Sequence, residues 1–334
     1  MKPADHPPLP APKIGVLLIN LGTPGAAEAG AVRRYLAEFL SDPRVVEIPR
    51  LIWKPILHGI ILRTRPAKSA HAYRQVWRED GSPLAAITRA LADGLTGRFG
   101  PGVLVDHAMR YGRPAIGERL AALKEQGCER ILLAPLYPQY CAATTATAND
   151  AAFAALAGMR WQPAIRTLPP YYDDPAYIAA LADSVRTSLA ALDFEPDTVM
   201  ASFHGMPQRT LALGDPYHCH CRKTARLLSD ALGRELIVAF QSRFGRAQWL
   251  EPATDTTLAA LPGQGVKRIA VVAPGFAADC VETLEELAIR GRETFLAAGG
   301  THFAYLPCLN DGPDGLSVTE SVIIRELEGW RTVS

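Results

Sequence analysis

The sequence predicts an α/β protein of two similar domains, each a parallel sheet flanked by helices. Short apolar, β-branched runs alternate with segments of helical periodicity, a pattern typical of parallel strands joined by crossover helices. The 334 residues suit two α/β domains of roughly 150 residues each. Short motifs of the first half also return in the second half in the same order. We therefore expect two Rossmann-like domains with the active cleft between them.

The predicted elements alternate along the whole chain. The expected strands are KIGVLLIN (13–20), GVLVDHAM (102–109), RILLAPLY (130–137), DTVMASFH (197–204), ELIVAFQS (235–242) and RIAVVAPG (268–275). The expected helices are AVRRYLAEFL (31–40), AIGERLAALKEQG (115–127), KTARLLSDAL (223–232) and VETLEELAIRGRETFL (281–296). This order is that of a chain that returns through a helix before each parallel strand.

The internal repeat predicts where the chain divides. The echoes are GTP (22–24) with GMP (205–207), RYGR (110–113) with RFGR (243–246), LAAL (120–123) with LAAL (258–261), and GCERI (127–131) with GVKRI (265–269). Four echoes in one order make chance a weak explanation. We expect a disordered lead-in over 1–12, an N-terminal domain over 13–193 and a C-terminal domain over 194–334.

The composition indicates an ordinary globular protein. Apolar residues make up 48% and charged residues 21%, with a formal net charge of +1, so nothing in the overall charge favours nucleic acid as a partner. The proline-rich start, MKPADHPPLPAPK, lacks the apolar core of a secretory signal, and no segment reaches the roughly 18 to 20 apolar residues of a membrane helix. We expect a cytoplasmic protein.

Two segments carry the candidate chemistry. His204 ends a buried strand in SFHGMP, and open α/β sheets bind ligands beyond the carboxyl ends of their strands. In APGFAADCVETLEELAIR, helical spacing predicts that Asp279, Glu282 and Glu286 share one face. A solvated helix face or a structural histidine would explain each segment alone. Together they offer an imidazole and carboxylates, the groups that handling of a divalent metal requires.

Other site chemistries lack their motifs. The chain has neither a G-x-G-x-x-G nor a G-x-x-x-x-G-K-[ST] phosphate loop, and no G-x-S-x-G nucleophile turn. Nucleotide binding and acyl transfer are therefore not expected.

Several long motifs resemble those of the ferrochelatase family, the terminal enzymes of haem synthesis. They are LLINLGTP, SFHGMP, GDPYHCHC, FQSRFG, QWLEP and APGFAADCVETLEE, and the resemblance runs from about Lys13 to Asn310. It implies insertion of Fe(II) into protoporphyrin IX, with release of two protons and haem. Iron is then a substrate, and no tightly bound cofactor is expected.

The resemblance also implies roles for individual residues. His204 and Glu282 match the residues assigned to iron binding and to removal of the pyrrole protons, without deciding which does which. Asp279 and Glu286 would form a relay for protons or metal. The residues expected to contact the porphyrin are Leu21, Trp53, Ile56, Arg63, Arg110, Tyr111, Trp249 and Phe276.

The segment 50–65 matches a lip that covers the porphyrin in the family and faces the membrane. We therefore expect peripheral contact with the inner face of a membrane, although a core helix with a basic end is the plainer interpretation.

The cysteines and the acidic row leave some questions open. His218-Cys219-His220-Cys221 resembles a zinc motif, but four alternating ligands cannot close on one tetrahedral ion unaided. Some relatives hold a [2Fe–2S] cluster, for which Cys219, Cys221, Cys280 and Cys308 could be proposed; we expect none, because their cysteine-rich extension is absent. Arg290 interrupts the acidic row. Alternative functions are the same chemistry on coproporphyrin III or with another tetrapyrrole or metal, and a non-catalytic porphyrin or haem carrier.

Overall fold

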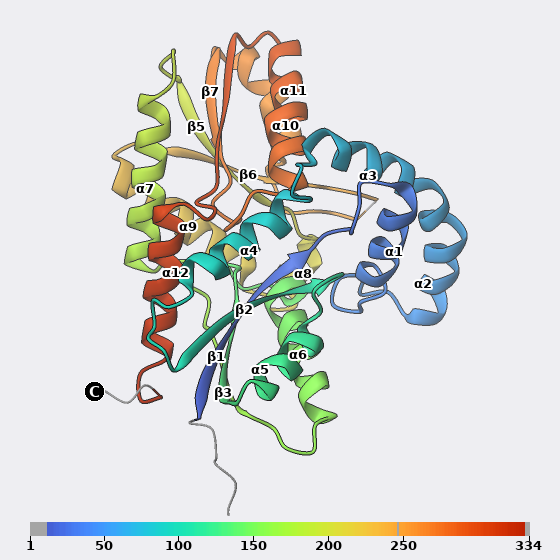
Figure 1. Ribbon diagram of the computed structural model, residues 1–334. Coiled ribbons are helices and arrows are strands. Elements are labelled where there is room, and N and C mark those ends of the chain that lie inside the picture. Colours follow the sequence, from blue (N-terminus) through green and yellow to red (C-terminus); the bar gives the residue numbers. More distant parts are fainter. Residues whose placement is uncertain (1–11, 246, 331–334) are drawn as a thin grey trace, which may run out of the picture.

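The computed structural model describes residues 12–245 and 247–330, and the expected lead-in lies almost wholly outside this range. Within it, two four-stranded sheets repeat one topology (Figure 1). The first has the order β2-β1-β3-β4 and is formed by β1 (Lys13–Gly22), β2 (Val103–Tyr111), β3 (Cys128–Pro135) and β4 (Ala164–Thr167). The second has the order β6-β5-β7-β8 and is formed by β5 (Thr198–His204), β6 (Leu236–Gln241), β7 (Arg268–Val272) and β8 (His302–Leu306).

All strand pairs within the two sheets are parallel. The first strand of each half lies between the second and the third, so the chain reverses its direction of winding there and leaves a crevice at the carboxyl ends of the strands. The prediction of two similar parallel α/β units is confirmed.

Helices cover both sheets. In the first half they are α1 (Ala29–Phe39), α2 (Arg50–Ile56), η1 (Leu57–Ile61), α3 (Leu62–Val76), α4 (Pro83–Leu95), α5 (Ile116–Glu125), η2 (Ala142–Ala146), α6 (Thr147–Ala157) and α7 (Pro175–Ala190). In the second half they are α8 (Gln208–Ala212), α9 (Tyr217–Leu232), α10 (Thr254–Ala260), η3 (Leu261–Gln264), η4 (Glu282–Gly291), α11 (Arg292–Ala297) and α12 (Pro313–Glu326). Within the described residues, none of these helices combines the length and hydropathy needed to cross a bilayer.

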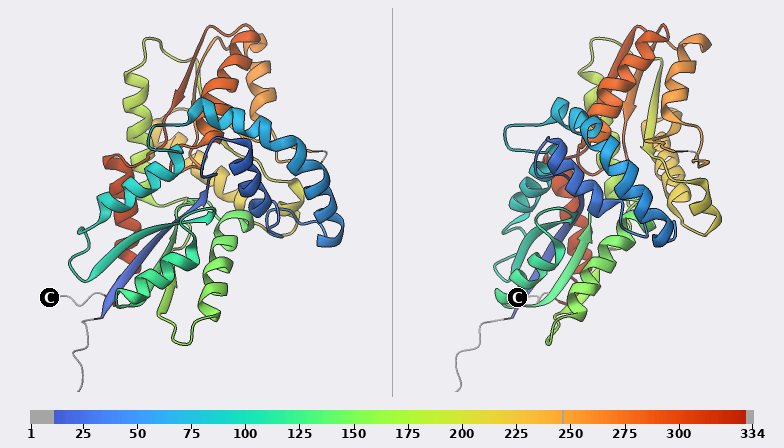
Figure 2. Two further views of the ribbon diagram at one scale, coloured as in Figure 1. Left: turned by 45° about the vertical axis from the view of Figure 1, so that its right-hand side comes forward. Right: turned by 90° about the vertical axis from the view of Figure 1, so that its right-hand side faces the viewer.

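The two halves exchange helices. The expected division near 193–197 falls between α7 and β5, yet α7 packs against α9 of the second half, while α12 at the end of the chain packs against α7 and α4 (Figures 1 and 2). Arg98 of the first half donates to Glu320 Oε2 of α12 at 2.7 Å. One hydrophobic core consequently contains residues of both sheets, including Leu18 of β1, Val199 of β5 and Val322 of α12.

The repeated glycine after the first strand of each half has a structural reason. Gly22 has φ +109°, and a Cβ there would lie 1.8 Å from the Tyr111 carbonyl oxygen at the end of β2. A Cβ on Gly205 would lie 2.5 Å from the Gln241 carbonyl oxygen at the end of β6. In both halves the backbone leaving the first strand crosses closely over the second, and only glycine permits this approach.

Candidate active site

The crevice of the second sheet brings the candidate chemistry together. His204 is the last residue of β5, and the loop after β7 leads to Glu282, the first residue of η4. Parallel strands β5 and β7 are neighbours, so both residues come from the carboxyl edge at the point where the winding reverses. Helix α3 of the first half packs against η4, which places the site between the two halves (Figure 1).

The tautomer of His204 is set by its neighbour. Its Nδ1 lies 2.7 Å from the Gly205 carbonyl oxygen. A carbonyl can only accept, so Nδ1 carries the hydrogen and Nε2 keeps a free lone pair. The side chain is half-buried, and its ring lies 6.5 Å from that of Phe276. His204 therefore presents a nitrogen that can take a proton or bind a metal ion.

Glu282 faces groups from the first half. Burial lowers the pKa of Arg65 in α3, an effect that the negative charge of Glu282 partly offsets. Burial raises the pKa of Tyr73 well above its ordinary value, and the charge of Glu282 raises it further. The backbone oxygen of Glu282 accepts a hydrogen bond of 2.8 Å from Gln241 Nε2. Gln241 is the register partner of His204, so one glutamine pairs with the first candidate reactive residue and hydrogen-bonds the backbone of the second.

The expected porphyrin contacts fall into two groups. Trp249 is buried, donates from Nε1 to the Phe244 carbonyl at 3.1 Å and forms a β-bridge with Pro207 just after β5, while Phe276 is half-buried against the core of the second sheet. Leu21 and Trp53 are half-buried against the cluster that fills the space under α1 and α3, and Trp53 Nε1 donates to the Leu40 carbonyl at 2.6 Å. Ile56 and Arg63 lie on the α2–α3 segment, half-buried and exposed respectively.

Arg110 and Tyr111 differ from expectation in where their polar groups point. Tyr111 is fully buried, and its hydroxyl donates to Asp42 Oδ2 at 2.9 Å. Arg110 Nη2 donates to the same oxygen, and its Nε donates to Thr147 Oγ1 at 2.7 Å. In this conformation Tyr111 belongs to the core under α1, and the guanidinium of Arg110 is occupied by a carboxylate of the chain itself.

Asp279 and Glu286 belong to separate hydrogen-bond networks. Asp279 is buried before η4 and accepts from Thr283 Oγ1 at 2.7 Å, from Tyr305 at 2.6 Å and from Asn310 Nδ2 at 2.8 Å. Glu286 accepts from Ser242 on the other side. The expectation of one acidic face assumed a single α-helix, whereas Asp279 lies before the helical segment and Glu282 and Glu286 lie in the π-helix η4.

The side chains of the motif at 218–221, at the start of α9, contact different neighbours and do not converge on one point. His220 Nδ1 accepts from the Tyr140 N–H at 3.2 Å and its ring stacks on Tyr172, while His218 stacks on Phe240. Cys219 is exposed and Cys221 is buried. Over residues 12–245 and 247–330, no three His, Cys, Asp or Glu side chains are grouped as they would be to hold a metal ion.

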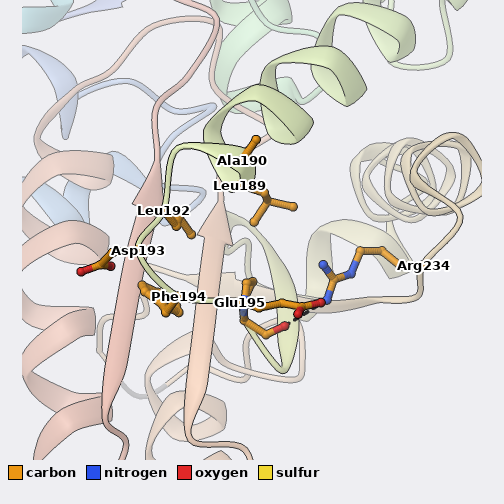
Figure 3. A pocket seen from close by; sticks show the side chains of 8 residues that line it. Leu189, Ala190, Leu192, Asp193, Phe194, Glu195 and Arg234 are labelled. Atoms are coloured by element: carbon orange, nitrogen blue, oxygen red, sulfur yellow. Dashed lines mark hydrogen bonds between the residues drawn. The ribbon is translucent and has the colours of Figure 1, made fainter.

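One hollow lies away from these residues. It has a volume of about 490 Å³ and is lined by the segment before β5, with Leu189, Phe194 and Arg234 among its side chains (Figure 3). A smaller cavity of about 120 Å³ adjoins η4 and is lined by Ser242, Glu286 and Arg290. The large hollow is open to solvent beside the amino-terminal start of β5, at the opposite edge of the sheet from His204.

Sequence reasoning missed Asp42, Tyr73 and the side-chain role of Gln241. Asp42 and Tyr73 are single polar residues in segments that resemble any amphipathic helix or turn. Gln241 was expected at a strand end, but nothing in its neighbours indicates that its amide would span from Ser202 Oγ to Glu282.

Comparisons with known proteins agree with the motifs. A family model described as ferrochelatase matches residues 13–327. A protein of Agrobacterium fabrum (strain C58 / ATCC 33970) named ferrochelatase is 55% identical over 98% of this chain and 97% of its own length. Another of that name, from Rhizobium meliloti (strain 1021), is 56% identical over 98% of each chain.

Solved structures share the fold at low identity. SirB from Bacillus subtilis with Fe3+ has a TM-score of 0.57 and 14% identity, over 95% of this chain and 96% of that one. The sirohydrochlorin chelatase SirB from Bacillus subtilis subspecies spizizenii, in complex with cobalt, has a TM-score of 0.56 and 13% identity, over 96% and 98% of the two chains. These likenesses support the two-sheet architecture.

Proposed function

Because the chain belongs to the ferrochelatase family, we infer that it inserts Fe(II) into protoporphyrin IX, forming haem and releasing two protons. The resemblance carried by SFHGMP and APGFAADCVETLEE is thereby confirmed at the level of family. Metallation replaces two pyrrole N–H protons by one divalent ion, so the site needs a basic lone pair near the ring and an anion to share the charge.

One observation carries the assignment of the reactive residues. His204 holds its hydrogen on Nδ1 and offers Nε2 at the carboxyl edge of the sheet where Glu282 begins η4. We propose that Nε2 of His204 and the carboxylate of Glu282 together bind the iron and receive the pyrrole protons. Arg65, which lies close enough to Glu282 for their charges to interact, would balance the anion while the site is empty.

Residues from both halves of the chain are candidates for contact with the porphyrin. We propose that Phe276 and Trp249 contact the macrocycle from the second half, and that Leu21, Trp53, Ile56 and Arg63 contact it from the first half. Arg110 and Tyr111 would reach it only if Asp42 released them, so we assign them no direct contact in this conformation.

We further propose a cytoplasmic protein that touches the membrane peripherally through 50–65. Leu51 is 91% exposed, and Ile52 and Ile60 are also largely exposed. Arg50, Lys54 and Arg63 are exposed on the same segment, so apolar and basic groups occur together as they do on interfacial helices.

The experiment is anaerobic metallation followed by absorption spectroscopy. His204→Ala and Glu282→Ala should each abolish haem formation, while binding of protoporphyrin persists in a fluorescence titration. His302→Ala is the matched control, because this exposed histidine begins β8 at the opposite edge of the sheet.

Two results would contradict the proposal. Full turnover by both variants would show that His204 and Glu282 are not the reactive residues. A wild-type chain that forms haem once per protein molecule would be a carrier, and assays with coproporphyrin III in parallel identify the preferred ring.

A further inference from the structure

Glu286 is bound on both oxygens by a single residue. Its Oε1 accepts from the Ser242 N–H at 2.7 Å, and its Oε2 accepts from Ser242 Oγ at 2.5 Å. Ser242 has φ +65°, a left-handed conformation that serine rarely adopts. A residue held there needs contacts that over-determine its backbone, and this pair of hydrogen bonds meets that need.

The clamped residue follows Gln241, which contacts both sides of the site. The Gln241 carbonyl accepts from the Gly205 N–H at 2.7 Å, directly after His204. Its side-chain Oε1 accepts from Ser202 Oγ at 2.8 Å, and its Nε2 donates to the Glu282 carbonyl at 2.8 Å. The position of Gln241 therefore determines where β5 ends and where η4 begins.

The contacts of Glu286 are poorly suited to a proton relay. Its oxygens already accept from Ser242, and the next residue outward in the row is Arg290, whose Nη2 lies 3.9 Å from Glu286 Oε2. Arg290 also donates from Nε to Glu285 Oε1 at 2.8 Å. A guanidinium has no atom that can accept a proton, so a proton cannot pass along this row of side chains beyond Arg290.

We propose that Glu286 is a positioning residue: its clamp on Ser242 fixes the turn after β6, and through Gln241 that turn holds His204 and Glu282 at their working separation. The inference rests on the proposed function for its catalytic readout. It replaces the expected relay role of Glu286 by a mechanical one.

The test compares Glu286→Gln with Glu286→Ala. Glutamine keeps an oxygen for the Ser242 N–H and can donate its amide hydrogen to Ser242 Oγ, so we expect kcat within about threefold of wild type. Alanine removes both bonds and should lower kcat by about 10- to 100-fold, the usual effect of losing a partner behind the reacting groups. KM for porphyrin should change little, because no porphyrin contact is lost.

Ser242→Gly supplies an independent arm. Glycine adopts φ +65° without strain and keeps the N–H but loses Oγ, so its effect should be smaller than that of Glu286→Ala. The double variant should be no worse than Glu286→Ala alone, because both changes remove the same contact. Glu293→Ala, an exposed carboxylate at the start of α11, is the matched control.

Hydrogen exchange separates this inference from the proposed function. In Glu286→Ala the amides of residues 240–243 should exchange faster than in wild type, whatever the chain catalyses, and Glu286→Gln should restore protection. If Glu286→Gln is as inactive as Glu286→Ala while exchange is unchanged in both, Glu286 is a relay and the positioning role is wrong. Failure of the wild type to make haem would instead overturn the proposed function. The hydrogen-exchange result would still show whether Glu286 fixes the turn at Ser242.

Discussion

Asp42 follows α1 and receives four hydrogen bonds. Its Oδ2 accepts from Thr147 Oγ1, Tyr111 and Arg110, and its Oδ1 accepts from the Arg44 N–H at 2.8 Å. Burial acts to raise the pKa of Asp42, but the hydrogen bonds and the charge of Arg110 outweigh it, and the net pKa lies below the ordinary value. The folded state thus favours the ionised carboxylate.

Asp42→Asn should lower the free energy of unfolding at pH 7 by about 2 kcal/mol, because the Arg110 guanidinium, only 18% exposed, loses its counter-charge. A carboxyl group whose folded pKa is depressed contributes stability above its unfolded pKa and loses it as pH falls through the folded pKa. The difference between the two chains should therefore shrink below about pH 4. Urea denaturation at several pH values measures it; a difference independent of pH would contradict the charge argument.

Single residues differ in how far the sequence can predict them. His204 could be placed at a strand end because the preceding run, DTVMASF, is continuously apolar. Tyr111 ends a strand in the same way, but an aromatic side chain there can face a ligand or the core, and the pattern is identical in both cases. The direction in which Tyr111 points is set by its hydrogen bond to Asp42, which lies 69 residues away in the chain. Such pairings appear only after folding.

At the scale of elements, the α2–η1 segment carries three of the large apolar side chains that are exposed among residues 12–245 and 247–330. Leu51, Ile52 and Ile60 are exposed there while Leu57 is fully buried, so the segment has one face toward the protein and one away from it. Membrane contact would bury that outer face.

Leu51→Ser combined with Ile52→Ser should weaken binding to vesicles of mixed zwitterionic and anionic phospholipid by roughly 10- to 100-fold, since partial burial of each side chain contributes on the order of 1 kcal/mol. Turnover of a water-soluble porphyrin should be retained. Phe153→Ser, an exposed apolar residue on α6, serves as control. Equal vesicle binding by all three chains, measured by co-sedimentation, would exclude this segment as the contact.

The helices also show where prediction by pattern ends. Three strands of each sheet could be located from apolar runs, whereas the edge strands β4 and β8, which are only partly buried, were not predicted. The run 281–296 is predicted as a single helix and is helical throughout, but residues 282–291 form the π-helix η4. The helical spacing of Asp279, Glu282 and Glu286 does not show that the helix begins only after Asp279, so the separation of Asp279 from Glu286 could not be predicted.

At the scale of the whole molecule, the two sheets are two repeats but share one core. Helix α7 belongs to the first half by sequence and packs on α9, and α12 packs on α4 and α7. Arg166 of β4 donates to the carbonyls of Glu326, the last residue of α12, and Glu328, just beyond it. The internal echoes of the sequence describe each sheet separately and carry no information on this exchange, because the helices that cross over lie outside the echoed motifs.

A shared core predicts that the halves unfold together. In urea, hydrogen-exchange mass spectrometry should show peptides from 13–193 and from 194–330 losing protection at one midpoint, and far-UV circular dichroism should give the same midpoint. Val322→Ala tests the coupling, because Val322 is 3% exposed on α12 within the common core. Its cavity should cost about 2 kcal/mol and shift both sets of peptides equally. If only the peptides of one half shift, or if two midpoints appear in the wild type, the halves unfold as independent domains. The exchanged helices then contribute little to the cooperativity of unfolding.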